Sequence, residues 1–209
     1  MAGKVTALKY QKRNRNRVSV YLDGRFAFGL PDVVAAKLKT GQHLSDVDIE
    51  RFQREGSAEA AYSRSLDYLS YRPRSRAEVE TYLEKRGYSE DEITEVIARL
   101  ERAGLLDDEA FARFWVENRE QFRPRGLRAL RYELRRKGVS DRIIERAVAG
   151  VDVSDSAYRS ASKKARQLGD ADQQTFYRKL VGYLARRGFD YEVAREVTDR
   201  HWAELQADD

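Results

Sequence analysis

The sequence predicts a mainly α-helical protein: an elongated tandem array of three three-helix repeats, preceded by a small module of a β-hairpin and short helices. The first observation is a recurring pentapeptide. LEKRG at 83–87, LRRKG at 134–138 and LARRG at 184–188 each hold a leucine, a polar or small residue, two bases and a glycine. A fixed period of this kind is typical of stacked helical repeats. The second observation is the charged fraction of 36%, above the ~25% of average soluble domains, which favours long solvated helices.

The composition excludes several classes of site. The chain has no cysteine, so disulfides, thiol catalysis and cysteine-based metal centres are excluded. Its two histidines, His43 and His201, are too few for a histidine metal site, and we expect no metal or cofactor. The first residues lack the apolar run of a signal peptide, and no run of about 18 apolar residues follows. We therefore expect a soluble, cytoplasmic protein.

Residues 1–56 are predicted to form the N-terminal module. Two alternating segments, VTALKYQ at 5–11 and RVSVYLDGRFAFGL at 17–30, read as strands. Asp23-Gly24 in the second segment is a strong two-residue hairpin turn. Residues 31–56 are predicted as one or two short helices, with Ser45 and Asp48 as a capping box. The module also carries a basic stretch: Lys9, Lys12, Arg13, Arg15 and Arg17.

The three repeats are predicted at 57–106, 107–153 and 154–209. In each, apolar residues recur at the three-, four- and seven-residue spacings of amphipathic helices. The second helices carry Val79, Tyr82 and Leu83, then Leu127, Leu130 and Leu134, then Tyr177, Leu180 and Leu184. Helix starts are expected at capping boxes Ser75–Glu78 and Ser89–Glu92, and at Asp107, Ser140, Ser154–Asp155 and Asp190.

The pentapeptide itself has a structural explanation. A glycine just past a helix end supplies the left-handed C′ position, and bases in the last turn suit the negative end of the helix dipole. We therefore predict that Gly87, Gly138 and Gly188 are structural residues.

The second repeat carries more positive charge than capping requires. RPRGLRALRYELRRK at 123–137 holds seven bases and one acid, and RPRS at 72–75 aligns with its start. If Leu127, Leu130 and Leu134 face the core, Arg128, Arg131 and Arg135 form a stripe about 100° further round the helix. Such a stripe suits phosphates or an acidic protein face. The same stripe is equally consistent with a solvated face whose bases pair with acids elsewhere in the chain.

The segments YRPRSRAEVETYLEKRG at 71–87, GLLDDEAFARFWVENR at 104–119 and GLRALRYELRRKG at 126–138 resemble the RecX family of bacterial recombination regulators. The similarity covers nearly the whole chain and is weakest in the third repeat, where QQTF at 173–176 replaces the Arg-Pro-Arg motif. The resemblance implies a monomer that negatively regulates the RecA recombinase. Members bind along the groove of the RecA–single-stranded DNA filament, restrain strand exchange, ATP hydrolysis and coprotease activity, and in many cases bind DNA directly.

By this resemblance, a set of basic residues would contact phosphate or the acidic surface of RecA. They are Arg72, Arg74, Arg76, Arg123, Arg125, Arg128, Arg131, Arg135, Arg136 and Lys137. Asp107 and Asp108 also match the family motif and are interpreted as a helix N-cap. The aromatic residues Tyr68 and Tyr71 near the first basic group are expected to be at least partly buried rather than to stack on bases.

Three other functions compete with this interpretation. An enzyme is not expected, because Asp107, Asp108 and Glu109 point in different directions from one helix start, whereas a two-metal site needs converging carboxylates. A general DNA-binding or architectural protein without a dedicated protein partner is consistent with the same bases. So is a scaffold for an acidic protein unrelated to recombination.

Overall fold

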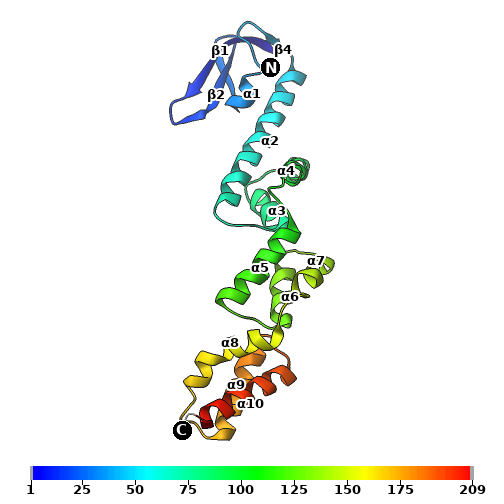
Figure 1. Cartoon of the computed structure of the whole chain (residues 1–209). Coiled ribbons are helices and arrows are strands. Elements are labelled where there is room, and N and C mark those ends of the chain that lie inside the picture. The colour runs from blue at the N-terminus through cyan, green and yellow to red at the C-terminus, as the bar shows by residue number, and fades with distance from the viewer. Residues whose placement is uncertain (1, 208–209) are drawn as a thin grey trace. The chain divides into compact units, whose positions relative to one another are not determined.

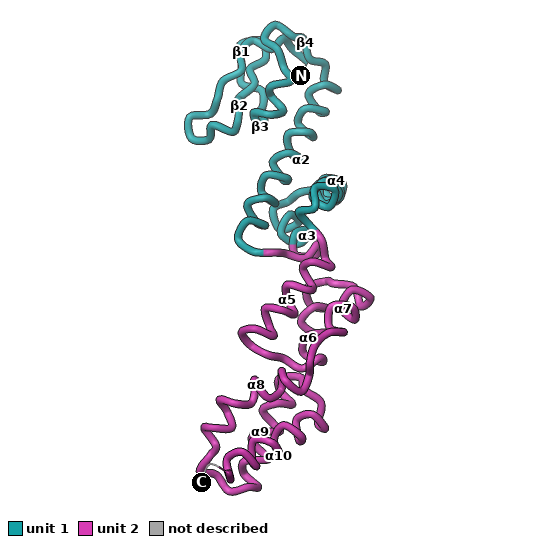
Figure 2. The backbone as a smooth tube through the Cα atoms, viewed as in Figure 1, with its two compact units in different colours: residues 1–72, 79–106 teal, residues 73–78, 107–209 magenta. Residues whose placement is uncertain are grey.

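The computed structural model describes residues 2–207 and consists of strands followed by a long series of helices (Figure 1). It divides into two compact units (Figure 2). The first comprises Met1–Arg72 with Val79–Leu106, and the second comprises Pro73–Glu78 with Asp107–Asp209. Helix α3, Arg76–Glu84, therefore has its first residues in the second unit and the remainder in the first.

The N-terminal module is a four-stranded antiparallel sheet. Its strands are β1 (Gly3–Gln11), β2 (Asn14–Leu22), β3 (Arg25–Pro31) and β4 (His43–Leu44), in the spatial order β3-β2-β1-β4. The predicted hairpin between β2 and β3 is confirmed, with Asp23 and Gly24 at φ values of 46° and 81°. The sequence did not reveal β4, which is only two residues long, or the pairing of β1 with β2.

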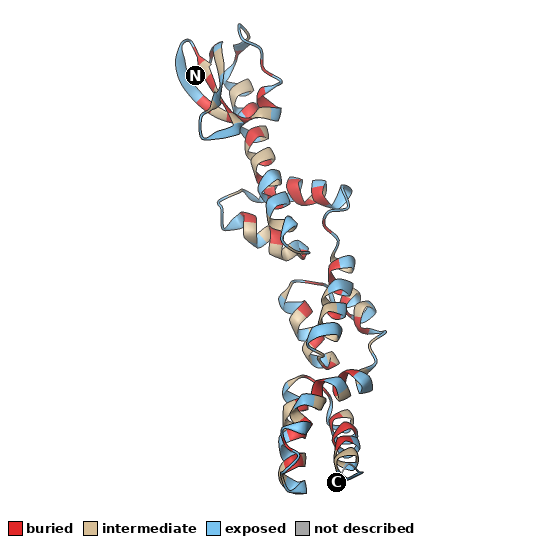
Figure 3. Ribbon diagram, turned by 60° about the vertical axis from the view of Figure 1, so that its left-hand side comes forward, coloured by how far each residue is buried: buried red, intermediate tan, exposed pale blue. Residues whose placement is uncertain are grey.

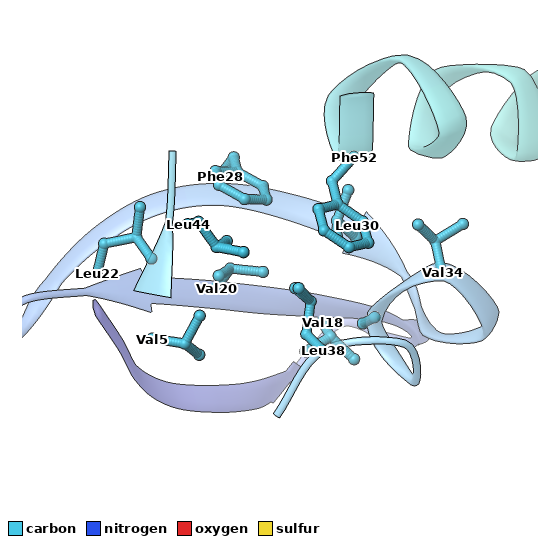
Figure 4. Close-up of a cluster of buried hydrophobic side chains, with 11 residues drawn as sticks. Val5, Val18, Val20, Leu22, Phe28, Leu30, Val34, Leu38, Leu44 and Phe52 are labelled. Atoms are coloured by element: carbon cyan, nitrogen blue, oxygen red, sulfur yellow. The ribbon is translucent and has the colours of Figure 1, made fainter. Parts of the chain in front are cut away.

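Alternating apolar side chains of the sheet point to one side and form a core (Figure 4). Val5, Val20 and Leu44 are fully buried there, and Phe52 of the following helix joins the same cluster beside Leu30 (Figure 4). That helix, α2, runs from Asp46 to Ser70 and begins with the predicted Ser45–Asp48 capping box.

Helix α2 is one element where the sequence predicted two. The predicted boundary between the N-terminal module (1–56) and the first repeat (57–106) falls inside α2, which is continuous. Gly56 lies inside this helix although glycine weakens helices. A Cβ atom at this position would be 2.7 Å from Leu30 Cδ2 of β3, so the absence of a side chain permits the close contact. The same helix then packs with α3 and α4 (Glu90–Arg102) around Val79, Leu83 and Leu100.

The second unit holds two further three-helix groups. They are α5 (Asp108–Phe122), α6 (Leu127–Arg136) and α7 (Asp141–Val148), then α8 (Val153–Arg166), α9 (Gln173–Arg186) and α10 (Tyr191–Ala207). Each group encloses its own core, and the buried residues lie on the inner helix faces (Figure 3). The predicted three three-helix repeats are thus confirmed.

In the third repeat, one predicted helix start is wrong by two residues and one predicted apolar stripe is incomplete. Helix α8 is capped by Asp152, whose carboxylate accepts from the Asp155 N–H, and not by Ser154 or Asp155. In α9, the predicted Tyr177 packs against the core, is half-buried and donates to Asp199, but the fully buried residue is its neighbour Phe176, which the prediction did not include. Phe176 and Tyr177 lie four and three residues before Leu180, so helical periodicity alone could not choose between them.

The pentapeptide glycines occupy the predicted left-handed C′ positions. Gly87, Gly138 and Gly188 have φ values of 81°, 76° and 88°. Two of them have a second role, because a Cβ atom on Gly138 would lie 2.3 Å from Ala77 Cβ, and one on Gly188 would lie 2.5 Å from Ala129 Cβ. Nothing lies within 4 Å of such an atom on Gly87.

These close approaches belong to a joint that occurs twice in the second unit. The N–H of Gly126, at the start of α6, donates to the Arg187 carbonyl oxygen after α9 (3.0 Å). In the same way the Ser75 hydroxyl, before α3, donates to the Lys137 carbonyl oxygen after α6 (2.6 Å). Each contact satisfies a carbonyl that a helix C-terminus leaves without an intrahelical partner. The N-terminus of the second helix in one repeat thus contacts the C-terminus of the second helix in the following repeat.

We predict that Gly138→Ala destabilises the protein more than Gly87→Ala. Both changes carry the left-handed cost of about 1–2 kcal/mol, but at Gly138 the new methyl group also collides with Ala77, for a total of about 2–4 kcal/mol. Urea unfolding followed by circular dichroism measures the difference. In a double-mutant cycle, Ala77→Gly should recover part of the loss in Gly138→Ala. Equal destabilisation at both glycines would contradict the close-packing role.

Candidate binding face on helix α6

Helix α6 presents one buried side and one strongly basic side. Leu130 and Leu134 are fully buried and Leu127 is half-buried, which confirms the predicted apolar stripe. The helix has no acid in its first turn and ends with Arg135 and Arg136. Arg128, Arg131 and Arg135 lie off the apolar stripe, as predicted, but the structure divides them into two groups.

Arg131 and Arg135 are paired with helix α7. The Arg131 guanidinium makes a two-point contact with Glu145, at 2.8 Å from Nε and 2.8 Å from Nη2. Arg135 Nε lies 2.7 Å from Asp141 Oδ1. The hydrogen bond from Arg131 lowers the pKa of Glu145, and the bond to Glu145 raises the pKa of Arg131. Arg131 and Arg135 therefore follow the second of the two alternatives, in which the bases pair with acids on another helix.

Three further bases of the predicted set are partly buried in the framework. Lys137 Nζ lies 2.6 Å from Glu78 Oε1 and 5.2 Å from the centre of the Trp115 ring. Arg74 lies 4.0 Å from the same Glu78 oxygen. Arg125 Nε is 3.8 Å from Glu133.

Glu133 lies on the flank of α6 that faces α5. Its carboxylate accepts from Trp115 Nε1 (2.9 Å) and Arg119 Nε (2.7 Å). The only acid of the 123–137 segment is therefore bound inside the repeat and faces α5.

The remaining bases of α6 face outward. Arg128, Tyr132 and Arg136 are exposed and lie four residues apart, so they share one side of the helix. Across residues 2–207, neither arginine forms an ion pair. Tyr132 is 60% exposed and its ring centre is 5.8 Å from the Arg136 guanidinium carbon. We call these three residues the Arg128–Arg136 face. The exposed Arg123 precedes the helix.

The aromatic predictions have a mixed outcome. Tyr68 is half-buried and stacks on Tyr82, with ring centres 4.0 Å apart, as expected. Tyr71 is 84% exposed, so its expected burial is wrong. Tyr71 is the C-cap residue of α2 and follows its last turn, where no other helix among residues 2–207 covers its ring. Our sequence reasoning missed Tyr132, although its four-residue spacing from Arg128 and Arg136 was a usable signal.

The acidic residues at 107–109 have structural partners. The Asp107 carboxylate accepts from the N–H groups of Glu109 and Ala110, which confirms it as the N-cap of α5. Asp108 instead accepts from the Arg76 N–H (2.8 Å), so its predicted role in the same cap is wrong. Among the described residues, no group of three or more His, Asp or Glu could hold a metal ion. Within the same part of the chain, every helix is too short or too polar to span a bilayer.

Four segments of the chain match family models of one regulatory protein. Residues 3–45 match the regulatory protein RecX N-terminal domain, and residues 61–100, 107–148 and 152–198 match the first, second and third three-helix domains of RecX. The matches include the sheet module and all three repeats.

Individual relatives and solved structures agree with these matches. Regulatory protein RecX of Bacillus subtilis (strain 168) is 34% identical over 202 residues, covering 94% of this chain and 76% of the relative. That of Mycolicibacterium vanbaalenii is 40% identical over 148 residues, covering 66% and 80%. A crystal structure of regulatory protein RecX superposes with a TM-score of 0.75 at 26% identity, covering 94% of this chain and 99% of the other. A crystal structure of RecX from Lactobacillus salivarius superposes with a TM-score of 0.61 at 27% identity, covering 72% of this chain and 97% of the other.

We predict that reversing charge has different effects at Arg128 and Arg131. Arg131→Glu places a carboxylate against Glu145 and should lower the thermal unfolding midpoint, whereas Arg128→Glu should leave it unchanged. Adding Glu145→Arg should restore the midpoint of Arg131→Glu by re-forming the pair in the opposite sense. Circular dichroism melts of the single and double variants test this. Equal midpoints for the two single variants would show that the Arg131–Glu145 pair contributes nothing.

The same pair predicts a pH dependence. Because the pKa of Glu145 is lowered in the folded protein, its contribution is present above the ordinary glutamate value of 4.5 and is lost as the pH falls through the lowered pKa. The midpoint difference between the wild type and Arg131→Gln should therefore be present at neutral pH and disappear in acid.

Proposed function

Because the chain belongs to the RecX family of regulatory proteins, we propose that it is a negative regulator of the RecA recombinase. It binds the RecA–single-stranded DNA filament and restrains the recombinase, ATPase and coprotease activities of RecA. It acts as a monomer in the cytoplasm, in homologous recombination, DNA repair and the SOS response. It also contacts DNA directly.

The Arg128–Arg136 face is the observation that carries this proposal. Neighbouring bases of the same helix are neutralised by Glu145 and Asp141, and the only acid of α6 is engaged by Arg119 and Trp115. The positive charge that remains is concentrated on one exposed side. A cluster of uncompensated arginines attracts phosphates or acidic side chains and offers two-point hydrogen bonding to either.

The ten basic residues predicted from the resemblance take two roles in this proposal. Exposed members other than Arg135, which is paired with Asp141, reach the filament, and Arg135 and the half-buried members hold the helices that present them. The exposed members are Arg76, Arg123, Arg128, Arg135 and Arg136, and the half-buried members are Arg72, Arg74, Arg125, Arg131 and Lys137.

A general DNA-binding or architectural protein remains the second candidate. The exposed aromatic ring of Tyr132 between two arginines favours direct contact with nucleic acid over contact with protein alone. The two candidates differ in stoichiometry. A filament regulator acts below the RecA concentration, whereas a DNA competitor acts only when it covers the DNA.

We predict that the protein inhibits RecA's ATP hydrolysis on single-stranded DNA at substoichiometric amounts. Arg128→Ala/Arg136→Ala should require a much higher concentration for the same inhibition, because the exposed charge is lost. Arg113→Ala/Arg142→Ala is the matched control, since it removes two exposed bases of α5 and α7 that have no ion pair within residues 2–207. Inhibition only at DNA-saturating amounts would replace the regulator with the DNA-binding candidate. An equal loss of inhibition in both double variants would show that the Arg128–Arg136 face is not the binding face.

A further inference from the structure

We propose that Tyr132 is a base-stacking site for single-stranded DNA, with Arg128 and Arg136 binding the phosphates on either side of the stacked base. This inference rests on the direct DNA contact included in the proposed function. It adds a residue that neither the motif nor the charge pattern had indicated, and it assigns the aromatic ring a chemical role separate from that of the arginines.

The ring of Tyr132 is one of several exposed tyrosine rings of the chain, and it is the one that lies between two exposed arginines on one side of a helix. Arg86 lies over the Tyr82 ring and Arg99 over the Tyr62 ring, each at 3.6 Å from the ring centre. The Arg136 guanidinium carbon lies over the Tyr132 ring at 5.8 Å from its centre, a longer distance than in those two pairs. The ring is nevertheless 60% exposed, so part of its surface is available for stacking on a base.

The hydroxyl group of Tyr132 is also unused within the protein. The Tyr158 hydroxyl donates to Glu204 and the Tyr177 hydroxyl donates to Asp199, so each anchors its ring to α10. Over residues 2–207, the Tyr132 hydroxyl makes no hydrogen bond. The packing of the repeat therefore gives no reason for a tyrosine at this position.

The three side chains stand in a row along the helix, with one arginine before the ring and one after it. An α-helix rises 1.5 Å per residue, so Arg128 and Arg136 each stand about 6 Å along the axis from Tyr132. The one acid of α6, Glu133, lies about 100° round the helix from Tyr132 and is held there by Trp115 and Arg119. Both arginines can therefore meet phosphates without internal competition.

The combination favours single-stranded DNA over other anionic partners. Stacking on an aromatic side chain needs the free face of an unpaired base, which a duplex does not offer. An acidic protein would need only the arginines. The helix positions that correspond in α9, 50 residues later, hold Arg178, Gly182 and Arg186, so the third repeat has the two bases without the ring. The stacking site therefore belongs to α6 and not to every second helix.

Binding of a short oligothymidylate to the full chain, without RecA, tests the proposal. Fluorescence anisotropy of the labelled oligonucleotide should show about 5- to 100-fold weaker binding for Tyr132→Ala. Tyr132→Trp should retain the affinity, and its added fluorescence should be quenched by the oligonucleotide once the wild-type signal is subtracted. Tyr191→Ala removes an equally exposed tyrosine, at 67%, from α10 and should bind as the wild type does. Equal melting midpoints check that the variants are folded.

The salt dependence separates stacking from charge. Arg128→Ala should reduce the slope of log affinity against log salt by about 0.7, as expected for one lost contact with a single-strand phosphate. Tyr132→Ala should weaken binding with the slope unchanged, because stacking releases no counterion. A lower slope in Tyr132→Ala would mean that the ring only positions the arginines, and the stacking role would be overturned.

The remaining outcomes distinguish the site from the regulatory function. Unchanged oligonucleotide affinity in Tyr132→Ala would overturn the stacking site and leave a phosphate-binding or protein-binding face. If only binding to the RecA filament were lost, the face would contact protein. If Tyr132→Ala weakened oligonucleotide binding while the wild type failed to inhibit RecA's ATPase, the stacking site would stand and the proposed regulatory function would fail.

Discussion

The second unit depends on one repeated contact, in which the N-terminus of the second helix of one repeat meets the C-terminus of the second helix of the following repeat. The Gly126 N–H meets the Arg187 carbonyl oxygen, and Gly188 approaches Ala129 so closely that a side chain on Gly188 would collide. Backbones approach this closely only where side chains are absent or very small. The joint also pairs helix-terminal donors with helix-terminal acceptors, which would otherwise need water. It fixes the first turn of α6 and therefore the direction in which the basic side of α6 faces.

The joint also explains why one helix can be both a structural element and a candidate binding surface. Leu130 and Leu134 anchor α6 in its own core, and Arg131 and Arg135 tie it to α7. With these contacts made, the side that carries Arg128 and Arg136 has no structural task within the described residues. Because its backbone is held from three directions, this side would be presented to a partner with little loss of conformational entropy on binding.

The N-terminal sheet is connected to the first repeat by a single continuous helix. Phe52 of α2 belongs to the sheet core, whereas Ala61 of the same helix lies in the core with Val79 and Leu83. Gly56 between them permits close contact with Leu30. The module and the first three-helix group therefore share α2 as a common element, which a division of the sequence into separate modules does not convey.

The sequence by itself determined most of the helices and strands, where most of them begin, and why the pentapeptide glycines are needed. Spacing, capping residues such as Ser89 with Glu92, and the Asp23-Gly24 turn act locally, so they can be interpreted without a structure. Tertiary structure alone decided which arginines of α6 are neutralised, because their partners Glu145 and Asp141 lie on another helix. It also decided that Tyr71 and Tyr132 are exposed. Periodicity identifies the buried side of a helix, but the use of the other sides depends on neighbours that only the packed fold brings into contact.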